Sequence, residues 1–432
     1  MQVMKWSVIA LAVAAGTTQM AVASEQSESK GFVEDSSLNL LLRNTYWNRD
    51  YNHGSPDVKT WGQAFIGTFE SGFTQGTVGV GVDAFGLLGL KLDGGQDDMF
   101  ELKSNGHRTD DVAQAGAAVK ARFSNTVIKY GNQMPSLPVL AYDDSRLLPQ
   151  SFTGTLVTSS EIEGLELNVG RFTQDSSMAS SSSDSGELKS IDVYGGSYKI
   201  NDRLSVALYA SDIEDVAKKK YANVNYQIPL SDEQSLAFDF NIYKTKYDKG
   251  FVEGYTAVDP SDDNPDGTPG VRESRDNTIF SLAGTYAFGA HALTLAYQQN
   301  TGDDGYKYDI GDGGSAIFLA NSYYSDFNAK DEKSMQLAYD LDFSAYGVPG
   351  LSWRSAYVYG WDIDTTSGQL DVGGKDNVKE REFFNQVKYT VQSGPAKDLA
   401  LKARNSIYRT DRAYGDDLNE WRLFIEYPLS IL

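Results

Sequence analysis

The segment Glu420-Trp-Arg-Leu-Phe-Ile-Glu-Tyr-Pro-Leu-Ser-Ile-Leu432 alternates apolar and polar side chains. Its apolar set occupies every second position from Trp421 to Ile431, and Arg422 and Glu426 fall between them. Successive side chains of a β-strand point to opposite faces, so this pattern predicts a strand with one apolar and one polar face. Its length matches the about 9–11 residues that a tilted strand needs to cross a bilayer.

The same alternation recurs along the chain, at residues 38–43, 78–84, 113–123, 235–242 and 335–343. A soluble β-sandwich would alternate in the same way, but the apolar sets here end in aromatic residues, as the interfacial girdles of membrane barrels do. The aromatic residues in question are Tyr46, Trp47, Tyr357, Tyr359, Trp361, Tyr389 and Tyr427.

The predicted connections are of two kinds, short ones such as 287–292 and long polar ones such as 250–277. Outer-membrane barrels have short periplasmic turns and long external loops. An open sheet edge is forbidden in lipid, so the strands must close on one another. At about 10 residues a strand, the chain predicts roughly 16–18 strands in an all-β, antiparallel transmembrane barrel with an aqueous lumen.

The N-terminus indicates export. Lys5 precedes a short apolar stretch at 6–15, and Ala21-Val22-Ala23 fits the small-x-small cleavage rule. The apolar stretch is too short for a membrane-anchoring helix, which is the alternative interpretation. We therefore predict a signal peptide at 1–23, a single barrel domain at 24–432, and the outer membrane of a Gram-negative bacterium as the location.

The charge balance and the histidine content argue against two classes of function. A formal net charge of −21 disfavours a nucleic-acid partner, because phosphate binding needs a basic face. An outer-membrane hydrolase needs a histidine base beside a carboxylate or serine, and none of His53, His107 and His291 lies in such a pattern. We predict a protein that is not an enzyme and has no cofactor or metal site. A hydrolase and a plugged structural barrel remain the alternatives, and both should conduct little ion current.

Basic residues share the polar face of the predicted strands. If the apolar positions face lipid, the side chains that point into the lumen include Arg43, Lys120, Arg122, Arg354, Lys388, Lys402, Arg404 and Arg422. The opposite assignment would cost about 2–4 kcal/mol for each cation near the midplane. Such a row of cations can pass a carboxylate from one site to the next. The alternative is a set of structural ion pairs with Asp83, Asp340, Asp342 and Glu426.

Three polar segments are predicted to be loops. Residues 131–149 contain three prolines and the charged residues Asp143, Asp144 and Arg146. This stiff segment is expected either to fold inward and narrow the lumen or to be an ordinary external loop. The serine-rich stretch 176–186 and the Asp-, Pro- and Gly-rich stretch 259–270 are expected to be mobile external loops.

Several blocks of the sequence resemble the OprD family of substrate-specific outer-membrane porins. The blocks are residues 31–50, 70–86, 145–150, 235–243, 317–322, 346–350 and 427–432. The resemblance implies an eighteen-stranded barrel with inward-folded loops, as a monomer, with a weak trimer as the alternative. It also implies a basic ladder at Arg43, Arg49, Lys402, Arg404 and Arg422, with Arg146 at the constriction.

Lys402 departs from the family pattern, which has a second arginine of an Arg-x-Arg pair there, and lysine lacks bidentate geometry. The resemblance implies passage of basic amino acids, small peptides and carbapenems, and aromatic or other monocarboxylic acids are the alternative. A basic amino acid would also need an acidic pocket, for which Asp326 is the candidate by family position and Asp143 and Asp144 by loop position. These acids could instead be solvated or tie loops together. The expected partners are outer-membrane lipid, lipopolysaccharide and small carboxylate solutes.

Overall fold

The computed structural model describes residues 24–52, 54–96, 99–186, 188–248, 275–308, 317–365, 375, 377–412 and 414–432. The predicted signal peptide, the 259–270 stretch and His53 lie outside these residues, so the expectations for them remain predictions.

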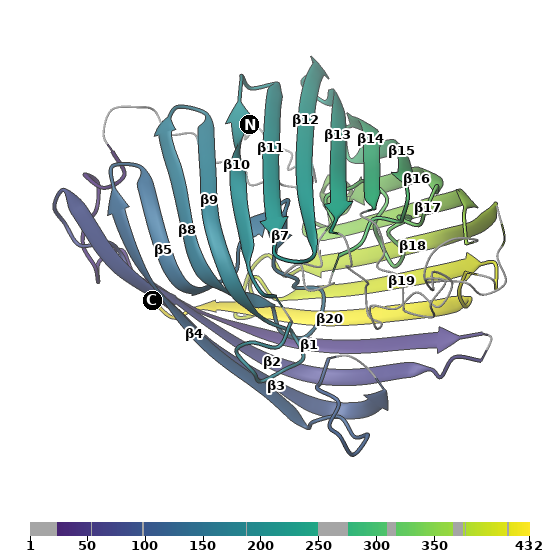
Figure 1. Ribbon diagram of the computed structural model, residues 1–432, viewed down its shortest axis with the longest axis horizontal. Helices are drawn as coiled ribbons and strands as arrows, with labels where there is room; N and C mark the ends of the chain where they lie inside the picture. The colour runs from purple at the N-terminus through teal and green to yellow at the C-terminus, as the bar shows by residue number, and fades with distance from the viewer. Residues whose placement is uncertain are drawn as a thin grey trace, which may run out of the picture.

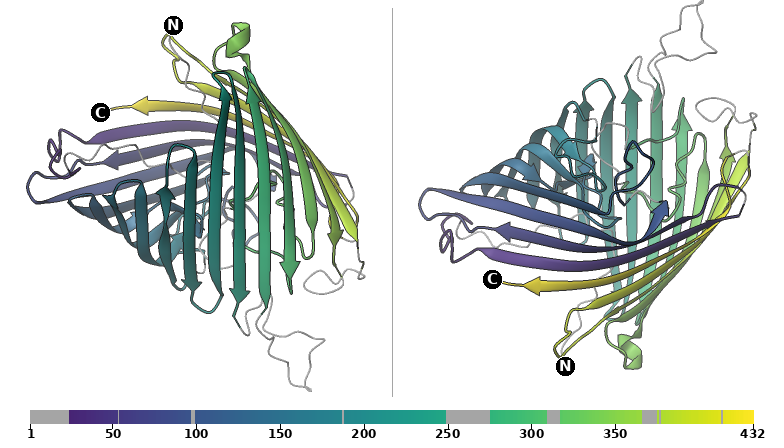
Figure 2. Two further views of the ribbon diagram at one scale, coloured as in Figure 1. Left: turned by 90° about the horizontal axis from the view of Figure 1, so that it is seen from above. Right: turned by 90° about the horizontal axis from the view of Figure 1, so that it is seen from below.

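The chain forms one closed antiparallel barrel of 18 strands (Figure 1; Figure 2). Each strand of the barrel pairs with the next, and β1 also pairs with β20, which closes the sheet. The predicted fold is confirmed. The strands of the barrel are β1 Ser37–Tyr51, β2 Val58–Glu70, β3 Val78–Gln96, β4 Asp111–Phe123, β5 Thr126–Gln133, β8 Ser151–Ile162, β9 Leu165–Ser176, β10 Ile191–Lys199, β11 Leu204–Ile213, β12 Ala217–Ser231, β13 Gln234–Tyr247, β14 Asp276–Phe288, β15 His291–Gly302, β16 Lys333–Asp342, β17 Leu351–Ile363, β18 Val378–Thr390, β19 Ala400–Thr410 and β20 Leu418–Ser430.

The two faces of each strand follow the predicted alternation. On β20, Trp421 and Leu423 are exposed on the outside, and Glu420 is buried on the inside. The same register puts all eight cations of the predicted lumen face on inward positions. The outer surface is therefore apolar where it would meet lipid, and these eight cations lie inside.

One local prediction is wrong, and one residue of the alternative set of ion pairs does not pair among the described residues. Trp47 is not an interfacial girdle residue: it is 2% exposed and points inward, because on β1 it shares a face with Arg43 and Arg49. Asp342 makes no lumen ion pair within the described part of the chain; it caps the 3-10 helix Phe343–Tyr346 and accepts a hydrogen bond from the Ser344 amide at 2.8 Å.

Among the residues that the structure describes, no helix is long and apolar enough to cross a bilayer.

The serine-rich stretch is held against the barrel wall rather than free in solvent. The side chain of Gln114 on β4 donates to the carbonyl oxygens of Ser177 and Ser180, at 2.7 and 2.6 Å. The Ser176 hydroxyl donates to the Ser182 carbonyl at 2.6 Å. An inward side chain of a distant strand thus satisfies part of the backbone of this segment, and its mobility stays a prediction.

Two connections fold into the lumen. The β5–β8 loop comprises residues 134–150 and contains the short hairpin of β6 Ser136–Leu137 and β7 Leu140–Ala141. The β15–β16 loop joins those two strands and is described at 303–308 and 317–332. Coloured segments of both lie inside the ring of strands in Figure 2.

The β5–β8 loop is anchored to the wall at two separate places. Leu140 packs in a buried cluster with Tyr243 of β13, whose hydroxyl donates to the Pro138 carbonyl at 2.9 Å. Leu147 packs in a second cluster with Trp47 of β1. The loop thus extends across the lumen from β13 to β1, and its polar tip lies between the two anchors.

The β15–β16 loop is held by polar side chains of the wall. Gln298 of β15 donates to the carbonyl oxygens of Asp326 and Phe327 at 2.7 and 2.9 Å. Asn300 donates to two further carbonyls of the same segment, both at 2.7 Å. Glu382 of β18 accepts two backbone amides of the loop, at 3.0 and 3.1 Å. Buried backbone groups need such partners, so these side chains allow irregular chain inside the barrel.

Two glycines make room for the β5–β8 loop. A Cβ atom at Gly62 of β2 would lie 2.7 Å from a methyl group of Leu147, and one at Gly89 of β3 would lie 3.0 Å from Leu147 and from Val112. The wall is therefore hollowed where the loop meets it, because these positions carry no side chain.

We expect Gly89→Leu to displace the β5–β8 loop, because the new side chain would occupy the space of Leu147. Overpacking of this kind costs about 1–3 kcal/mol. Single-channel conductance in a planar bilayer should change, and the midpoint of urea unfolding should fall. Gly86→Leu is the matched control, since Gly86 lies on the outer face of the same strand with nothing within 4 Å of an added Cβ. Equal behaviour of the two variants would show that the loop does not depend on this glycine.

Candidate functional site

Six cations from four neighbouring strands form a basic wall on one side of the lumen. Lys388 of β18 lies opposite Lys402 of β19, and Arg404 of β19 lies opposite Arg422 of β20. These positions alternate with outward residues, so the side chains share the inner face. The wall comprises Arg43, Arg49, Lys388, Lys402, Arg404 and Arg422.

One carboxylate organises the upper part of the basic wall, nearest the long connections. Glu420 binds Arg49 at 2.8 Å and Arg422 at 2.6 Å, and accepts the indole N–H of Trp47 at 2.7 Å. The Trp47 ring lies 4.9 Å from the Arg49 guanidinium carbon and 4.0 Å from that of Arg422. Two guanidinium groups share one buried carboxylate, so positive charge remains while the side chains are held in place.

The lower part of the basic wall is less compensated. The Lys402 ammonium lies 3.9 Å from Glu426, at the limit of an ion pair. The Arg404 guanidinium carbon lies 5.1 Å from the centre of the Phe384 ring. Considering only the described residues, neither Arg404 nor Lys388 has a carboxylate within 4 Å. Their charge is therefore available to an anion in the lumen.

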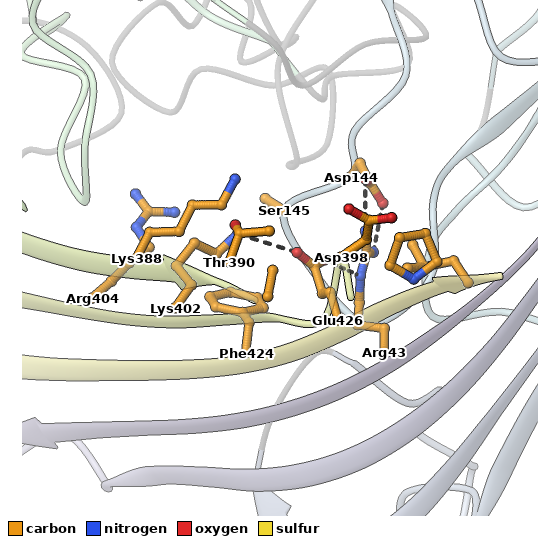
Figure 3. Close-up of a pocket in the computed structure, with 13 residues that line it drawn as sticks. Arg43, Asp144, Ser145, Lys388, Thr390, Asp398, Lys402, Arg404, Phe424 and Glu426 are labelled. Carbon is orange, nitrogen blue, oxygen red and sulfur yellow. Dashed lines mark hydrogen bonds and ion pairs between the residues drawn. The ribbon is translucent and has the colours of Figure 1, made fainter. Parts of the chain in front are cut away.

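Arg43 joins the basic wall to the β5–β8 loop. Its guanidinium binds both carboxylate oxygens of Asp144, at 2.6 and 2.9 Å, and Glu426 at 2.8 Å (Figure 3). It also donates to the carbonyl oxygens of Arg146 and Leu147, at 3.3 and 3.4 Å. The bidentate pair fixes the tip of the loop against β1.

A cavity of about 460 Å³ lies between the loop tip and the lower part of the basic wall. Asp144 and Ser145 line it on the loop side (Figure 3). Lys388, Lys402 and Arg404 line it on the other side, from two adjacent strands. The cavity is large enough for a small organic acid. Arg43 is its fourth cation, and the carboxylates of Asp144, Asp398 and Glu426 also line it.

Acidic groups gather where the two inward loops meet. Asp326 of the β15–β16 loop is half-buried and accepts hydrogen bonds from the hydroxyls of Ser322 and Tyr308. Burial raises the pKa of Asp326, the two hydroxyl donors lower it, and the nearby Asp143 carboxylate raises it further. Asp143 accepts the Ser145 amide at 2.6 Å. Of two consecutive aspartates, Asp144 therefore faces the basic wall and Asp143 faces Asp326.

Three predicted ladder residues lie outside the basic wall and have partners of their own. Lys120 of β4 binds Asp83 at 2.5 Å. Arg122 lies over the Phe73 ring at 4.2 Å and donates to the Gln26 side chain at 3.0 Å.

Arg354 of β17 binds Asp340 at 2.9 Å and donates to the Tyr323 hydroxyl. Arg146 is half-buried on the β5–β8 loop. The predicted cations thus separate into the basic wall, whose lower part borders the cavity, a set with partners on other strands, and Arg146 on the loop.

Sequence reasoning missed the groups that position the basic wall. Glu420 precedes Arg422 by two residues and so shares its face, which is a signal that could have been used. Phe384 and Glu382 lie in 379–386, where charged and aromatic residues follow one another without clean alternation. The inward face of that strand could not be assigned from the pattern.

A family model described as "outer membrane porin, OprD family" matches residues 30–431. The chain belongs to the OprD family. Porin D of Pseudomonas aeruginosa is 48% identical over the full length of both chains. The chain is accordingly a substrate-specific porin of the Gram-negative outer membrane.

Solved structures of OprD-family porins have the same fold. OccAB1 of Acinetobacter baumannii superposes with a TM-score of 0.86 at 43% identity, over 95% of this chain and all of the other. OpdK of Pseudomonas aeruginosa, solved with vanillate, gives 0.80 at 32% identity, over 93% of this chain and all of the other. The family and fold point to a transporter rather than an enzyme. Of the histidines, His291 stacks on Phe288 with its Nδ1 2.7 Å from the Tyr339 hydroxyl, and His107 is exposed.

We expect Arg43→Gln to loosen the β5–β8 loop, since the charge-assisted bonds to Asp144 and Glu426 are lost. The free energy of unfolding should fall by about 2 kcal/mol. Single-channel recordings should show more frequent current interruptions as the loop tip moves. Asp144→Asn keeps the shape of the tip and the Arg43–Glu426 pair, so it should give a smaller effect. A current trace as quiet as that of the native protein would contradict the clamp.

Proposed function

We propose that this porin conducts small carboxylate-bearing solutes along the basic wall, and that basic amino acids are favoured among them. The single observation that carries the proposal is the cavity, which Lys388, Lys402 and Arg404 line from one side. Three carboxylates also line it, those of Asp144, Asp398 and Glu426. Arg43 binds two of them, and within the described residues Lys388 and Arg404 have no carboxylate within 4 Å. Guanidinium and ammonium groups bind carboxylates through charge-assisted hydrogen bonds. Lys388 is exposed, and Lys402 and Arg404 are half-buried. Transport requires that each of these contacts is weak enough for release.

The acidic side of the constriction supports the preference for basic amino acids. Such a solute carries a carboxylate for the wall and a cationic group for Asp143 and Asp326. A simple acid can use only the wall, and an amine only the acidic side. The two arrays of opposite sign thus orient a solute that carries both charges. Small peptides and carbapenems also carry a carboxylate, and belong to the same proposal.

Aromatic monocarboxylic acids are the second candidate. Two buried aromatic rings lie against the cations of the basic wall: Lys402 lies 4.2 Å from the Phe424 ring, and Arg404 lies over Phe384. An aromatic acid would bind these cations through its carboxylate and place its own ring against the Arg404 guanidinium group. OpdK, 32% identical to this chain, was solved with vanillate, an acid of this type.

Arg404→Ala should lower the uptake of arginine, glutamate and benzoate into protein-containing liposomes by about fivefold, as expected for loss of one charge interaction. Uptake of a neutral sugar should be unchanged. Arg354→Ala is the control, because Arg354 is already paired with Asp340. An equal loss for acids and sugar would show that the wall acts on pore size and not on charge.

The rate of entry of the three solutes distinguishes the candidates. If arginine enters faster than both glutamate and benzoate, the acidic side contributes as proposed. If benzoate enters fastest, the second candidate is favoured. If no solute interrupts the single-channel current or enters liposomes despite verified insertion, both candidates are wrong.

Preference for lysine or arginine over glutamate should weaken as the pH falls. Burial raises the pKa of Asp326, so this carboxylate takes up a proton at a higher pH than an ordinary aspartate and then no longer attracts a cation. Asp326→Asn should lower the preference at neutral pH and flatten its pH dependence. The measurement is the ratio of lysine to glutamate flux across liposomes at a series of pH values. A ratio with the same pH dependence in both proteins would assign the effect to other groups.

A further inference from the structure

Four lysines form a square on the outer surface of the barrel, on β12 and β13. These strands lie side by side in Figure 1, and their register sets Lys218 opposite Lys246 and Lys220 opposite Lys244. Directly opposite residues in an antiparallel pair have Cα atoms about 4.5–5.5 Å apart, and alternate residues of one strand are about 7 Å apart. The four ammonium groups therefore can converge on one small ligand. We call this set the lysine square.

The lysine square faces outward, at the end of the barrel that bears the long connections. Lys219 and Thr245, which alternate with its members, are buried on the inner face. Further along the same outer face the strands become apolar, and Val224 and Phe238 are exposed there. The square therefore lies where the apolar belt of the barrel meets the headgroup region of the outer leaflet.

The lysine square is poorly compensated. Lys218 binds Asp212 at 2.6 Å, and Asp276 lies opposite Lys246 in the register of β13 and β14. Within the described ranges, Lys220, Lys244 and Lys246 have no carboxylate within 4 Å.

Two other outward lysines at this end of the barrel are paired. Lys59 lies 3.3 Å from Asp93, and Lys333 lies 2.8 Å from Asp362. Like charges directly opposite one another on a sheet are destabilising. The pairing of Lys220 with Lys244 is thus a cost that a bound anion would remove.

We propose that the lysine square binds the phosphate groups of lipid A, the anchor of lipopolysaccharide in the outer leaflet. A phosphate offers several acceptor oxygens, and lysine is a point-charge donor well suited to it. The neighbouring apolar belt would contact the acyl chains of the same molecule. A soluble anion would make no contact with the apolar belt, so the position of the lysine square beside that belt favours a lipid ligand.

Native mass spectrometry of the detergent-purified protein tests this proposal by titration with diphosphoryl lipid A. Lys220→Gln combined with Lys244→Gln should weaken binding about tenfold, and Lys220→Arg combined with Lys244→Arg should retain it. Monophosphoryl lipid A should bind the native protein more weakly. The matched control is Lys59→Gln combined with Lys333→Gln, which removes two outward lysines that already have carboxylate partners and should leave binding unchanged.

Unchanged binding by the Lys220/Lys244 double glutamine variant would overturn the proposal. Equal weakening in the control would also overturn it, since any loss of surface charge would then suffice. Displacement of lipid A by equimolar inorganic phosphate would assign the square to a free anion instead of a lipid. Native single-channel conductance of each variant verifies that its barrel is folded.

Discussion

The pairing of β1 with β20 is the interaction on which the rest of the structure depends. Hydrocarbon offers no partner to a backbone amide or carbonyl, so an unpaired edge strand there is not tolerated. Because β1 pairs with β20, every strand has a hydrogen-bonded neighbour on both sides. Each strand then has one face toward lipid and one toward the lumen. The apolar outside follows from this constraint, and so does the inner surface on which the cations gather.

The same demand for backbone partners governs the loops inside the barrel. A loop in the lumen loses solvent, so its carbonyls and amides need donors and acceptors from the wall. Gln298, Asn300 and Glu382 supply them to the β15–β16 loop. The inward polar residues thus form two groups: some hold the loops, and others, such as Lys388 and Arg404, remain open to the cavity.

The sequence predicted the strands and the inward face of the cations because both depend on alternation, which is local. Alternation could not predict which residues from distant parts of the chain contact one another. Arg43 meets Asp144, which is 101 residues away, and no periodic pattern indicates that contact. For the same reason the pattern could not separate Arg404, which borders the cavity, from Lys120, which is bound to Asp83. The inward position of Trp47 was missed because it adjoins an outward aromatic residue, Tyr46.

The order of strands in the basic wall has a consequence for the path of a solute. From Arg49 on β1 the cations pass to Arg422 on β20, then to β19, and finally to Lys388 on β18. Each strand lies about 4.8 Å from the next, so the wall shifts sideways by roughly 14 Å as it descends. A carboxylate that stays in contact with the wall therefore follows a helical path around the barrel axis instead of a path parallel to that axis. The tilt of the strands sets the pitch of this helical path, so the geometry of the whole barrel fixes how far the solute turns during passage.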